Sequence, residues 1–510
     1  MIVPGQSTHY QESRGGDIRT RENTPPSGGQ ALPGRFGRIF DLPAFDPSPD
    51  LLKDLACRMT VDPVVAGDEE NDSEIPSGYT FLGQFITHDL TFDTTSLQDQ
   101  ANDQQAPSSY RTPRLDLDSV YCQSPTLKDP PKRNGAKMAI DSRSDQDETI
   151  EDLPRYPQGS TDPERPAGRA IIGDPRNDET VVLCQLHLAF LKLHNRFVDE
   201  FWADGERDEG RLYELAQEQC RWHFQWVVVN DYLPKIVDEK VLKQILLSKP
   251  GDPPNVRLKF YKPVDPAKPM IPLEFAVAAF RFGHSMIRPV YRVGRGGFAV
   301  RLFPRSNGDD HLGGLRPITS SHVVVWSRFF HDLPPASVEL KNHAKKIDAR
   351  MPESLGRIPV QFSPGSADTS PETFSLALRD LQKGVDRKLP SGQRVAGAIK
   401  TKFDETEVLS NAKLCEESPH LSLNNPGWKD QAPLWFYILQ EARQQAGGEH
   451  LGQVGSRIVA EVILGLLKYD PTSYFNAKPD FLPTTVGGGR PIDFKMGSLL
   501  QLAEVAPLQS

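Results

Sequence analysis

Residues 173–201 read GDPRNDETVVLCQLHLAFLKLHNRFVDEF, and the second half of this stretch decides the fold class. Its apolar residues recur at spacings of three and four, the pattern of an α-helix with one buried face. The series is Leu183, Leu186, Phe190, Leu193, Phe197 and Phe201. Helical patterns also cover residues 221–237, 272–287 and 455–468, and strand-type alternation is scarce. The sequence therefore predicts a mainly α-helical fold.

The segments between the expected helices are long and polar. Residues 1–35, 95–168 and 340–372 are dense in Gly, Pro, Ser, Asp or Gln, which favours loops and, at the N-terminus, a surface arm. The chain has 510 residues, of which 45 are Pro and 39 are Gly. A length that could hold about three domains therefore also fits one loop-rich domain.

The composition argues against several classes of protein. The net charge of −9 disfavours a dedicated binder of nucleic acid or of anionic membranes. No run approaches the ~18 apolar residues of a membrane span. The five Cys include no CxxC motif, and so sparse a set suits a reducing compartment. The N-terminus lacks an apolar signal segment, so we expect a protein that is cytoplasmic or exported by another route.

The first candidate site is the stretch GQFITHD at residues 83–89. On a helix, Gln84 and His88 are i, i+4 neighbours on one face, and Asp89 points about 100° away. One face then carries a proton acceptor beside an amide, and the next face carries a carboxylate. Taken alone, the stretch fits better a histidine at the edge of the core with an exposed aspartate.

The second candidate site is the stretch TPRLDLDSVY at residues 112–121. Thr112, Asp116 and Asp118 place side-chain oxygens at alternating positions, which can wrap around a hard cation such as Ca²⁺. The stretch lacks the central Gly and terminal Glu of an EF-hand. Taken alone, it reads as a solvated acidic loop.

The third candidate is Arg176, in the polar run ahead of the helix expected at 183–201. A guanidinium there can donate a fixed fork of N–H groups to developing negative charge, although a surface arginine beside a helix cap is the simpler interpretation. His187 and His194 follow on that helix, roughly 10 Å apart along its axis. This is too far for them to share a metal, so we predict that both are structural.

The fourth candidate is His284, in a helix expected to begin at Pro272 and to end before Arg288 and Pro289. The predicted buried seam of this helix is Leu273, Val277, Phe280, His284 and Ile287. Gly283 beside the histidine would let a flat group approach the backbone. A lone core histidine is more often structural, but a neutral imidazole is also the usual axial ligand of haem iron.

These four motifs, in this order, resemble the animal-type haem peroxidases over residues 36–475. The resemblance rests on GQFITHD, TPRLDLDSVY, GDPRNDET with LHLAFLKLHNR, and AFRFGHSMIRPVY, and is supported by NDYLPKIV, LRDLQKGVDRKLPSG and VGSRIVAEVILG. It implies a single large helical catalytic domain over 36–475, with long loops and few short strands. Residues 1–35 would form a flexible arm, and 476–510 an extension packed on or trailing the domain.

The resemblance also implies roles and cofactors. His88 would be the distal base with Gln84 as its companion. Arg176 would be the distal arginine, and His284 the proximal ligand of the iron of haem b. A calcium site is implied at Asp89, Thr112, Arg114, Asp116 and Asp118, where Arg114 would contribute only its backbone carbonyl.

Several positions depart from the family pattern. Thr87 stands where halide-oxidising mammalian members have an ester-forming Asp, whereas Glu179 matches the second ester position, so at most one ester to haem is implied. Asp380 replaces an Asn that often bonds the proximal histidine, and a carboxylate there should stabilise oxidised iron. Asp118 replaces a common Ser ligand of calcium. Arg281 stands where related fatty-acid dioxygenases carry a radical Tyr.

The implied activity is reduction of hydrogen peroxide coupled to oxidation of a small reductant. His88 would move a proton from the first peroxide oxygen to the leaving one, and Arg176 would stabilise the developing charge. One alternative is a haem-dependent fatty-acid dioxygenase, which the residue at position 281 disfavours. Another is a non-catalytic binding or adhesion protein on the same scaffold, which the intact catalytic set disfavours. The sequence leaves the reducing substrate open between phenols, halides and others.

Overall fold

The structure is a computed structural model that describes residues 34–60, 71–92, 108–109, 111–124, 129–145, 148–304, 310–334, 340–358 and 375–506. The expected N-terminal arm lies outside these residues up to position 33. Parts of the loops expected at 95–168 and 340–372 lie outside them as well.

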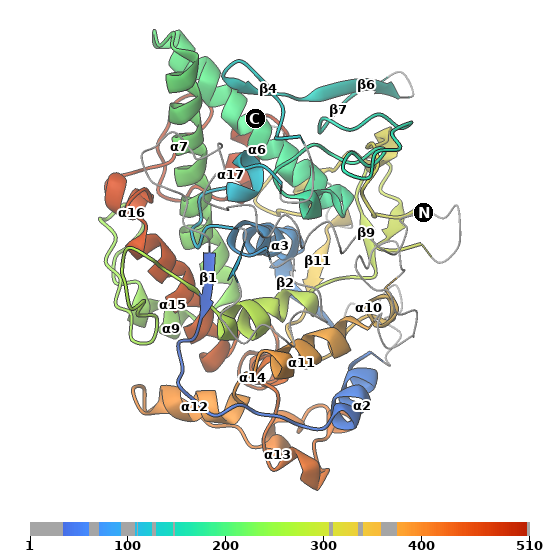
Figure 1. The fold of residues 1–510 in the computed structure, drawn as a ribbon, viewed down its shortest axis with the longest axis vertical. Helices are drawn as coiled ribbons and strands as arrows, with labels where there is room; N and C mark the ends of the chain where they lie inside the picture. Colours follow the sequence, from blue (N-terminus) through green and yellow to red (C-terminus); the bar gives the residue numbers. More distant parts are fainter. Residues whose placement is uncertain are drawn as a thin grey trace.

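The prediction of a mainly helical fold is confirmed (Figure 1). The α-helices are α2 Pro49–Met59, α3 Gly78–Leu90, α5 Asp118–Tyr121, α6 Val181–Ala203, α7 Glu209–Val227, α8 Leu233–Ile236, α9 Glu239–Ile245, α10 Glu353–Gly356, α11 Leu376–Asp386, α12 Gly392–Lys400, α13 Asn411–Leu414, α14 Leu434–Ala446, α15 Gln453–Tyr469, α16 Tyr474–Ala477 and α17 Met496–Leu502. Tighter 3₁₀ turns form η3 Pro175–Asp178, η6 Ala279–His284, η7 Ser320–His322, η8 Trp326–Arg328, η12 Pro419–Leu421 and η13 Pro426–Trp428. Wider π turns form η4 Val228–Tyr232 and η5 Glu274–Ala278.

The strands are short and make small separate sheets. β1 Gly34–Gly37 lies between β3 Ser108–Ser109 and β8 Ile271–Pro272. The remaining strands pair in twos: β2 Asp72–Pro76 with β11 His343–Lys345, β4 Arg133–Asn134 with β5 Lys137–Met138, β6 Asp141–Asp145 with β7 Glu148–Asp152, and β9 Val290–Arg292 with β10 Ala299–Arg301. None of these described sheets is large enough to form a core, so the helices must supply it.

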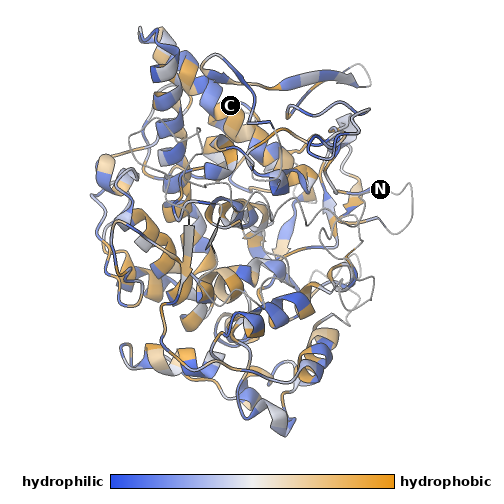
Figure 2. Ribbon diagram, in the orientation of Figure 1, coloured by the Kyte–Doolittle hydropathy of each residue, from blue (hydrophilic) through white to orange (hydrophobic). Residues whose placement is uncertain are grey.

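Helix α3 lies in the middle of the molecule and contacts α5, α6, η3 and η6 (Figure 1). Phe85 of α3 stacks on Phe190 of α6 with ring centroids 4.9 Å apart, and Phe224 of α7 meets both rings edge-on. Figure 2 shows that the segments around α15 are largely hydrophobic, whereas the projecting end of α7 is mostly hydrophilic. The predicted helices at 183–201 and 455–468 are confirmed as α6 and α15.

The segment 272–287 is helical, but the prediction of one helix beginning at Pro272 is wrong. Pro272 ends the short strand β8, which pairs with β1. The chain then forms the π turn η5 and the 3₁₀ turn η6, with a break at Ala278 (φ −129°, ψ −72°). Buried Glu274 accepts hydrogen bonds from the backbone N–H groups of Ile39 and Phe40, both at 3.3 Å. This tertiary anchor fixes the first turn in a way that apolar spacing does not show.

The predicted seam of that segment is only partly buried. Leu273, Val277 and Phe280 are buried, whereas His284 and Ile287 are half-buried. The helix expected at 221–237 is likewise divided, into the end of α7, the π turn η4 and α8. Pro234 lacks the N–H that a regular α-helix would direct to the preceding turn, and the π turn lies directly ahead of it.

The C-terminal segment contributes α17, which packs against α6 and η8. The backbone N–H of Met496, at the start of α17, donates to Asp231 at 2.9 Å. No helix in the described part of the chain has both the length and the apolar character needed to cross a membrane.

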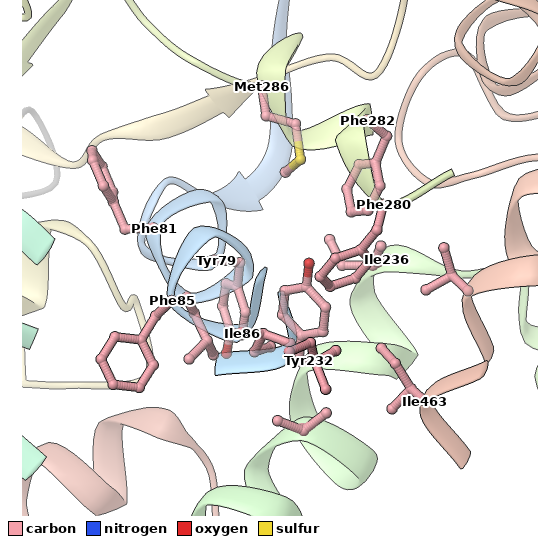
Figure 3. Packing of buried hydrophobic residues seen from close by; sticks show 14 of the residues in the cluster. Tyr79, Phe81, Phe85, Ile86, Tyr232, Ile236, Phe280, Phe282, Met286 and Ile463 are labelled. Atoms are coloured by element: carbon pink, nitrogen blue, oxygen red, sulfur yellow. The ribbon is translucent and has the colours of Figure 1, made fainter. Parts of the chain in front are cut away.

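Tyr232 packs directly on the backbone of α3. Figure 3 shows its ring between α3 and Phe280, and the two ring centroids are 6.2 Å apart. A Cβ atom at Gly83 would lie 2.5 Å from the Tyr232 hydroxyl oxygen, which is closer than van der Waals contact allows. Gly83 therefore sets the distance between α3 and η4.

We expect Gly83→Ala to destabilise the protein by about 1–3 kcal/mol, because the overpacking outweighs the helix propensity gained. Tyr232→Phe should restore much of this loss in the double variant, since it removes the hydroxyl that clashes. Chemical denaturation measures both effects. Gly397→Ala in α12 is the matched control, since its Cβ would meet no atom within 4 Å. A Gly83→Ala protein as stable as the wild type would contradict the expected clash.

Candidate active site

His88 lies near the C-terminal end of α3 and is 5% exposed. Its Nδ1 donates to Oδ1 of Asn177 at 2.8 Å. The Nδ2 group of the same Asn177 donates to Nδ1 of His187 at 3.1 Å. Because the amide oxygen can only accept, Nδ1 of His88 carries the proton and Nε2 keeps its lone pair. Asn177 therefore fixes the tautomer in which His88 can take up a proton.

The environment of His88 also keeps its ring neutral. Burial, and next the positive charge of Arg176, lower the pKa of His88 to about 3. An imidazole with that pKa is uncharged throughout the neutral and mildly acidic pH range. Gln84, one turn earlier on the same face as predicted, is half-buried and makes no side-chain hydrogen bond to a described residue.

Arg176 is held against the end of α3 by a dense set of hydrogen bonds. Its Nε and Nη2 donate to the carboxylate of Asp174 at 3.0 and 2.7 Å. Nη2 also donates to the carbonyl oxygens of Thr91 and His88 at 2.6 and 3.1 Å. The guanidinium lies 4.4 Å from the ring centroid of Phe92. Within the described part of the chain, Nη1 makes no hydrogen bond.

Asp174 is the residue that orients Arg176. Its carboxylate is completely buried and also caps η3 by accepting from the backbone N–H of Arg176 at 3.0 Å. Burial alone would raise the pKa of Asp174, but the charges of Arg176 and Arg111 lower it below its ordinary value. The carboxylate of Asp174 therefore stays charged at neutral and mildly acidic pH, and remains an ionic partner of Arg176 there.

The acidic residues of the predicted calcium site come together around the start of α5. Asp89 accepts hydrogen bonds from the backbone N–H groups of Leu117 and Ser119 at 3.1 and 3.0 Å. Thr112 donates its hydroxyl to Asp116 at 2.8 Å and its backbone N–H to Asp118 at 3.3 Å. Asp89 thus points away from His88 toward a different loop, as the sequence predicts.

Burial and repulsion between carboxylates disfavour the charged forms of Asp116 and Asp89. Burial, and next the charge of Asp118, raise the pKa of Asp116 to about 7. Burial, and next the charge of Asp116, raise the pKa of Asp89 well above its ordinary value. The side chain of Arg114 lies 3.6 Å from Asp470, outside this group. In the geometry of the described residues, no three His, Cys, Asp or Glu side chains share a point suited to one metal ion.

His284 lies at the end of η6 and is joined to a buried carboxylate. Its Nδ1 donates to Asp380 of α11 at 2.5 Å. Arg281, one turn earlier, donates to the other oxygen of the same carboxylate. Burial alone would raise the pKa of Asp380, but the charges of His284 and Arg281 lower it to about 2. Because Nδ1 of His284 is engaged by Asp380, Nε2 is the ring nitrogen available to bind a ligand.

Glu179 lies within electrostatic range of Arg176 and of Arg379, the residue before Asp380. Burial raises its pKa to about 7, against the opposing charge of Arg176. Arg379 of α11 interacts electrostatically with Asp380, Arg281 and Glu179. The residues around His284 and those around Arg176 therefore border the same region. The described hydrogen bonds, however, do not connect His88 with His284.

His187 and His194 are both buried, as expected of structural histidines. His194 contacts the Tyr121 hydroxyl at 3.2 Å and the carbonyl oxygen of Ala136 at 2.9 Å. Sequence reasoning missed the roles of Asn177 and Asp174 and the pairing of Arg281 with Asp380. Asn177 directly follows Arg176 and Asp174 lies two residues before it, so their position was a usable signal. No local pattern links residues 281 and 380.

Comparison of the sequence with known proteins identifies a matching family and several relatives. The family model of the animal haem peroxidases matches residues 94–304. Thyroid peroxidase of Sus scrofa is 29% identical over 248 residues, which are 46% of this chain and 24% of that protein. A peroxidase-like protein of Margaritifera margaritifera is 30% identical over 228 residues, which are 43% of this chain and 26% of that protein. The chain thus matches about a quarter of the length of these relatives.

Solved structures resemble the fold over nearly the whole chain. Peroxidase A of Dictyostelium discoideum has a TM-score of 0.62 at 15% identity, covering 96% of this chain and 98% of that one. The fatty acid alpha-dioxygenase of Arabidopsis thaliana has a TM-score of 0.56 at 14% identity, covering 92% and 76%. At these identities the likeness concerns the fold alone.

Proposed function

Since this chain belongs to the animal-type haem peroxidase family, we propose that it is a haem-dependent peroxidase that reduces hydrogen peroxide and oxidises a small reductant. The observation that carries the proposal is the geometry at His88. Asn177 holds its Nδ1, its Nε2 keeps a lone pair, and the arginine that lowers its pKa is anchored beside it.

The residues around His284 fit a haem group. An imidazole with one nitrogen held by a carboxylate would bind the haem iron through its other nitrogen, and the carboxylate would raise its basicity. A Cβ atom at Gly283 would meet no atom within 4 Å, so the backbone beside the histidine is accessible to a flat group. When bound there, haem b would supply the iron at which hydrogen peroxide is reduced, by giving up the two electrons that the small reductant later restores.

The protein side chains would handle the proton and the charge. Nε2 of His88 takes the proton of the first peroxide oxygen and returns it to the leaving oxygen. Asn177 keeps the ring in the required tautomer during both transfers. Nη1 of Arg176 is the donor left for negative charge that develops as the O–O bond breaks, because Nε and Nη2 are engaged elsewhere. Gln84 would lie beside His88 on the side where peroxide binds.

A dioxygenase of fatty acids is the alternative suggested by the fold. That chemistry would need a redox-active Tyr at position 281, and this chain has Arg281 there. A guanidinium is not redox-active, and here it donates a hydrogen bond to Asp380. The residue type at position 281 supports the peroxidase proposal over the dioxygenase.

The deciding experiment is an absorption spectrum of the purified protein before and after one equivalent of hydrogen peroxide. We expect a haem Soret band that changes on addition, and peroxide-dependent oxidation of a phenolic dye. Oxygen uptake with an unsaturated fatty acid and no added peroxide would support the dioxygenase instead. A stably folded protein that takes up no haem would refute both and leave the binding protein.

We also propose that Glu179 forms a single ester to haem. Thr87 lacks a carboxylate, and its hydroxyl donates to the Gly83 carbonyl oxygen at 2.9 Å within α3. After extraction with acidified organic solvent, we expect haem to stay with the wild-type protein and to be released from Glu179→Gln. Complete release from the wild type would rule the ester out.

We propose that a Ca²⁺ ion binds at Asp89, Asp116 and Asp118, because a cation would relieve the repulsion between these buried carboxylates. Their side chains would have to turn toward a common point, since in the described geometry no three of them share one. Thr112 and the backbone carbonyl of Arg114 would complete the oxygen ligands. We expect chelation to lower the melting temperature by several degrees, since a ligand at a hundredfold excess over Kd stabilises by about 3 kcal/mol. Asp116→Asn should reduce this sensitivity. An unchanged melting temperature with no metal in elemental analysis would contradict the site.

A further inference from the structure

Arg111 is the most deeply buried cation near the candidate site, and its side chain is 0% exposed. It directly precedes the Thr112–Tyr121 stretch, and we call residues 111–121 the acidic loop. Its partners, however, lie in two different segments. Burying a guanidinium is costly unless opposite charges and hydrogen bonds compensate it. The contacts of Arg111 therefore indicate which segments it stabilises.

On one side, Arg111 holds the acidic loop. Its Nη1 donates to the carbonyl oxygen of Asp118 at 3.1 Å and lies 3.5 Å from the carboxylate of the same residue. On the other side, its Nη2 donates to the Gly173 carbonyl oxygen and to the Asp174 carboxylate, both at 2.8 Å. The two loops are therefore joined through one side chain.

The Asp174 carboxylate that receives Arg111 is the same one that receives Arg176. Oδ2 accepts from Nη2 of both arginines, at 2.8 and 2.7 Å, and Oδ1 accepts from Nε of Arg176 at 3.0 Å. Phe92 lies beside both guanidinium groups, 5.3 Å from that of Arg111 and 4.4 Å from that of Arg176. The position of Asp174 thus depends on Arg111, and the position of Arg176 depends on Asp174.

The backbone of Gly173 locks the same two loops together. A Cβ atom there would lie 2.5 Å from the carbonyl oxygen of Cys122 and 2.6 Å from that of Ser119. Ser119 in turn donates its backbone N–H to Asp89 at the end of α3. The backbone at Ser119 and Cys122 therefore packs directly on Gly173.

We propose that Arg111 and Asp174 are a buried positioning pair that holds Arg176 against α3 and couples it to the acidic loop. The coupling to catalysis rests on the proposed function of Arg176. Neither residue of the pair contacts the reacting atoms, and both act through the direction in which Nη1 of Arg176 points. Arg111→Met should release Asp174 and let the segment 173–178 move.

Hydrogen–deuterium exchange of the full-length protein tests the pair without reference to activity. We expect Arg111→Met to speed exchange in residues 173–178 at least tenfold. Arg457→Met is the matched control, because Arg457 is a buried arginine in α15 paired with Glu461 at 4.0 Å and lies in another part of the fold. It should lower stability and leave 173–178 protected. Arg111→Lys keeps a charge without the fork of donors, so it should give intermediate exchange, and it replaces Arg111→Met if that variant does not fold.

Cyanide affinity of the ferric haem protein, followed by the shift of its absorption band, tests the consequence for Arg176. We expect about tenfold weaker binding in Arg111→Met, since a displaced arginine no longer donates to the bound anion. Equal exchange in the arginine variants at 111 and 457, with cyanide affinity within twofold of wild type, would overturn the proposal. If the wild type shows no cyanide-dependent band, the proposed function fails, while the exchange result still decides on the positioning pair.

Discussion

Replacing His88 with Ala is expected to lower the rate of reaction with peroxide by 10²–10⁴-fold, the usual contribution of a general acid–base residue. The buried ring has the right tautomer for this role, because Asn177 accepts from its Nδ1 at 2.8 Å. Haem binding should persist in the variant, since the proposed iron ligand is His284. The initial rate of phenolic dye oxidation, at equal haem content, measures the effect.

Asn177→Ala is a milder variant that tests the same step. It keeps the imidazole and removes only the group that orients it, so we expect a loss of about tenfold to a hundredfold. Gln84→Ala, on the same face of α3 but without a hydrogen bond to the ring, should have a smaller effect. Full dye oxidation by the His88→Ala protein would show that another group moves the proton.

The lowered pKa of His88 also predicts the pH dependence of this step. A base works only while unprotonated, and with a pKa of about 3 the ring stays neutral as the pH falls through 6.5. The wild-type rate of reaction with peroxide should therefore stay level from neutral pH to about pH 4 and fall only as the pH approaches 3. A loss of half the rate near pH 6.5 would mean that the ring is exposed to solvent.

Replacing Asp380 with Ala is the second change with a large expected effect. The carboxylate is 1% exposed and serves both His284 and Arg281. Its removal leaves the guanidinium without its partner, and we expect a loss of about 3 kcal/mol of stability. The histidine also loses the group that fixes its orientation, so haem affinity should fall about tenfold to a hundredfold. Chemical denaturation and haem titration measure the two effects separately.

Two milder variants separate charge from orientation at the same place. Asp380→Asn keeps an acceptor for His284 but removes the charge, so the imidazole becomes less anionic and the reduction potential of the iron should rise. Arg281→Met leaves the carboxylate to the histidine alone, and the potential should fall. Shifts in the same direction for both variants would show that Asp380 does not control the charge of the imidazole.

Much of the helical framework follows from local sequence. Spacings of three and four predict α6, because its face of Leu and Phe residues must be buried whatever packs on it. The i, i+4 relation of Gln84 and His88 on α3 follows from helix geometry in the same way. The segment 272–287 departs from this rule, because buried Glu274 binds the backbone of Ile39 and Phe40, more than 230 residues earlier in the chain.

The sequence by itself determined the helical fold class, the separate environments of His88 and Asp89, and the residue types that proton transfer and iron ligation require. These properties depend on periodicity and on the chemistry of single side chains. Only the tertiary structure decided which charge meets which. The contacts of Asp380 with Arg281 and His284, and of Asp174 with Arg111, join distant segments. Burial makes such pairs obligatory, since a charge without its partner would be too costly, but nothing in the local sequence says where the partner lies.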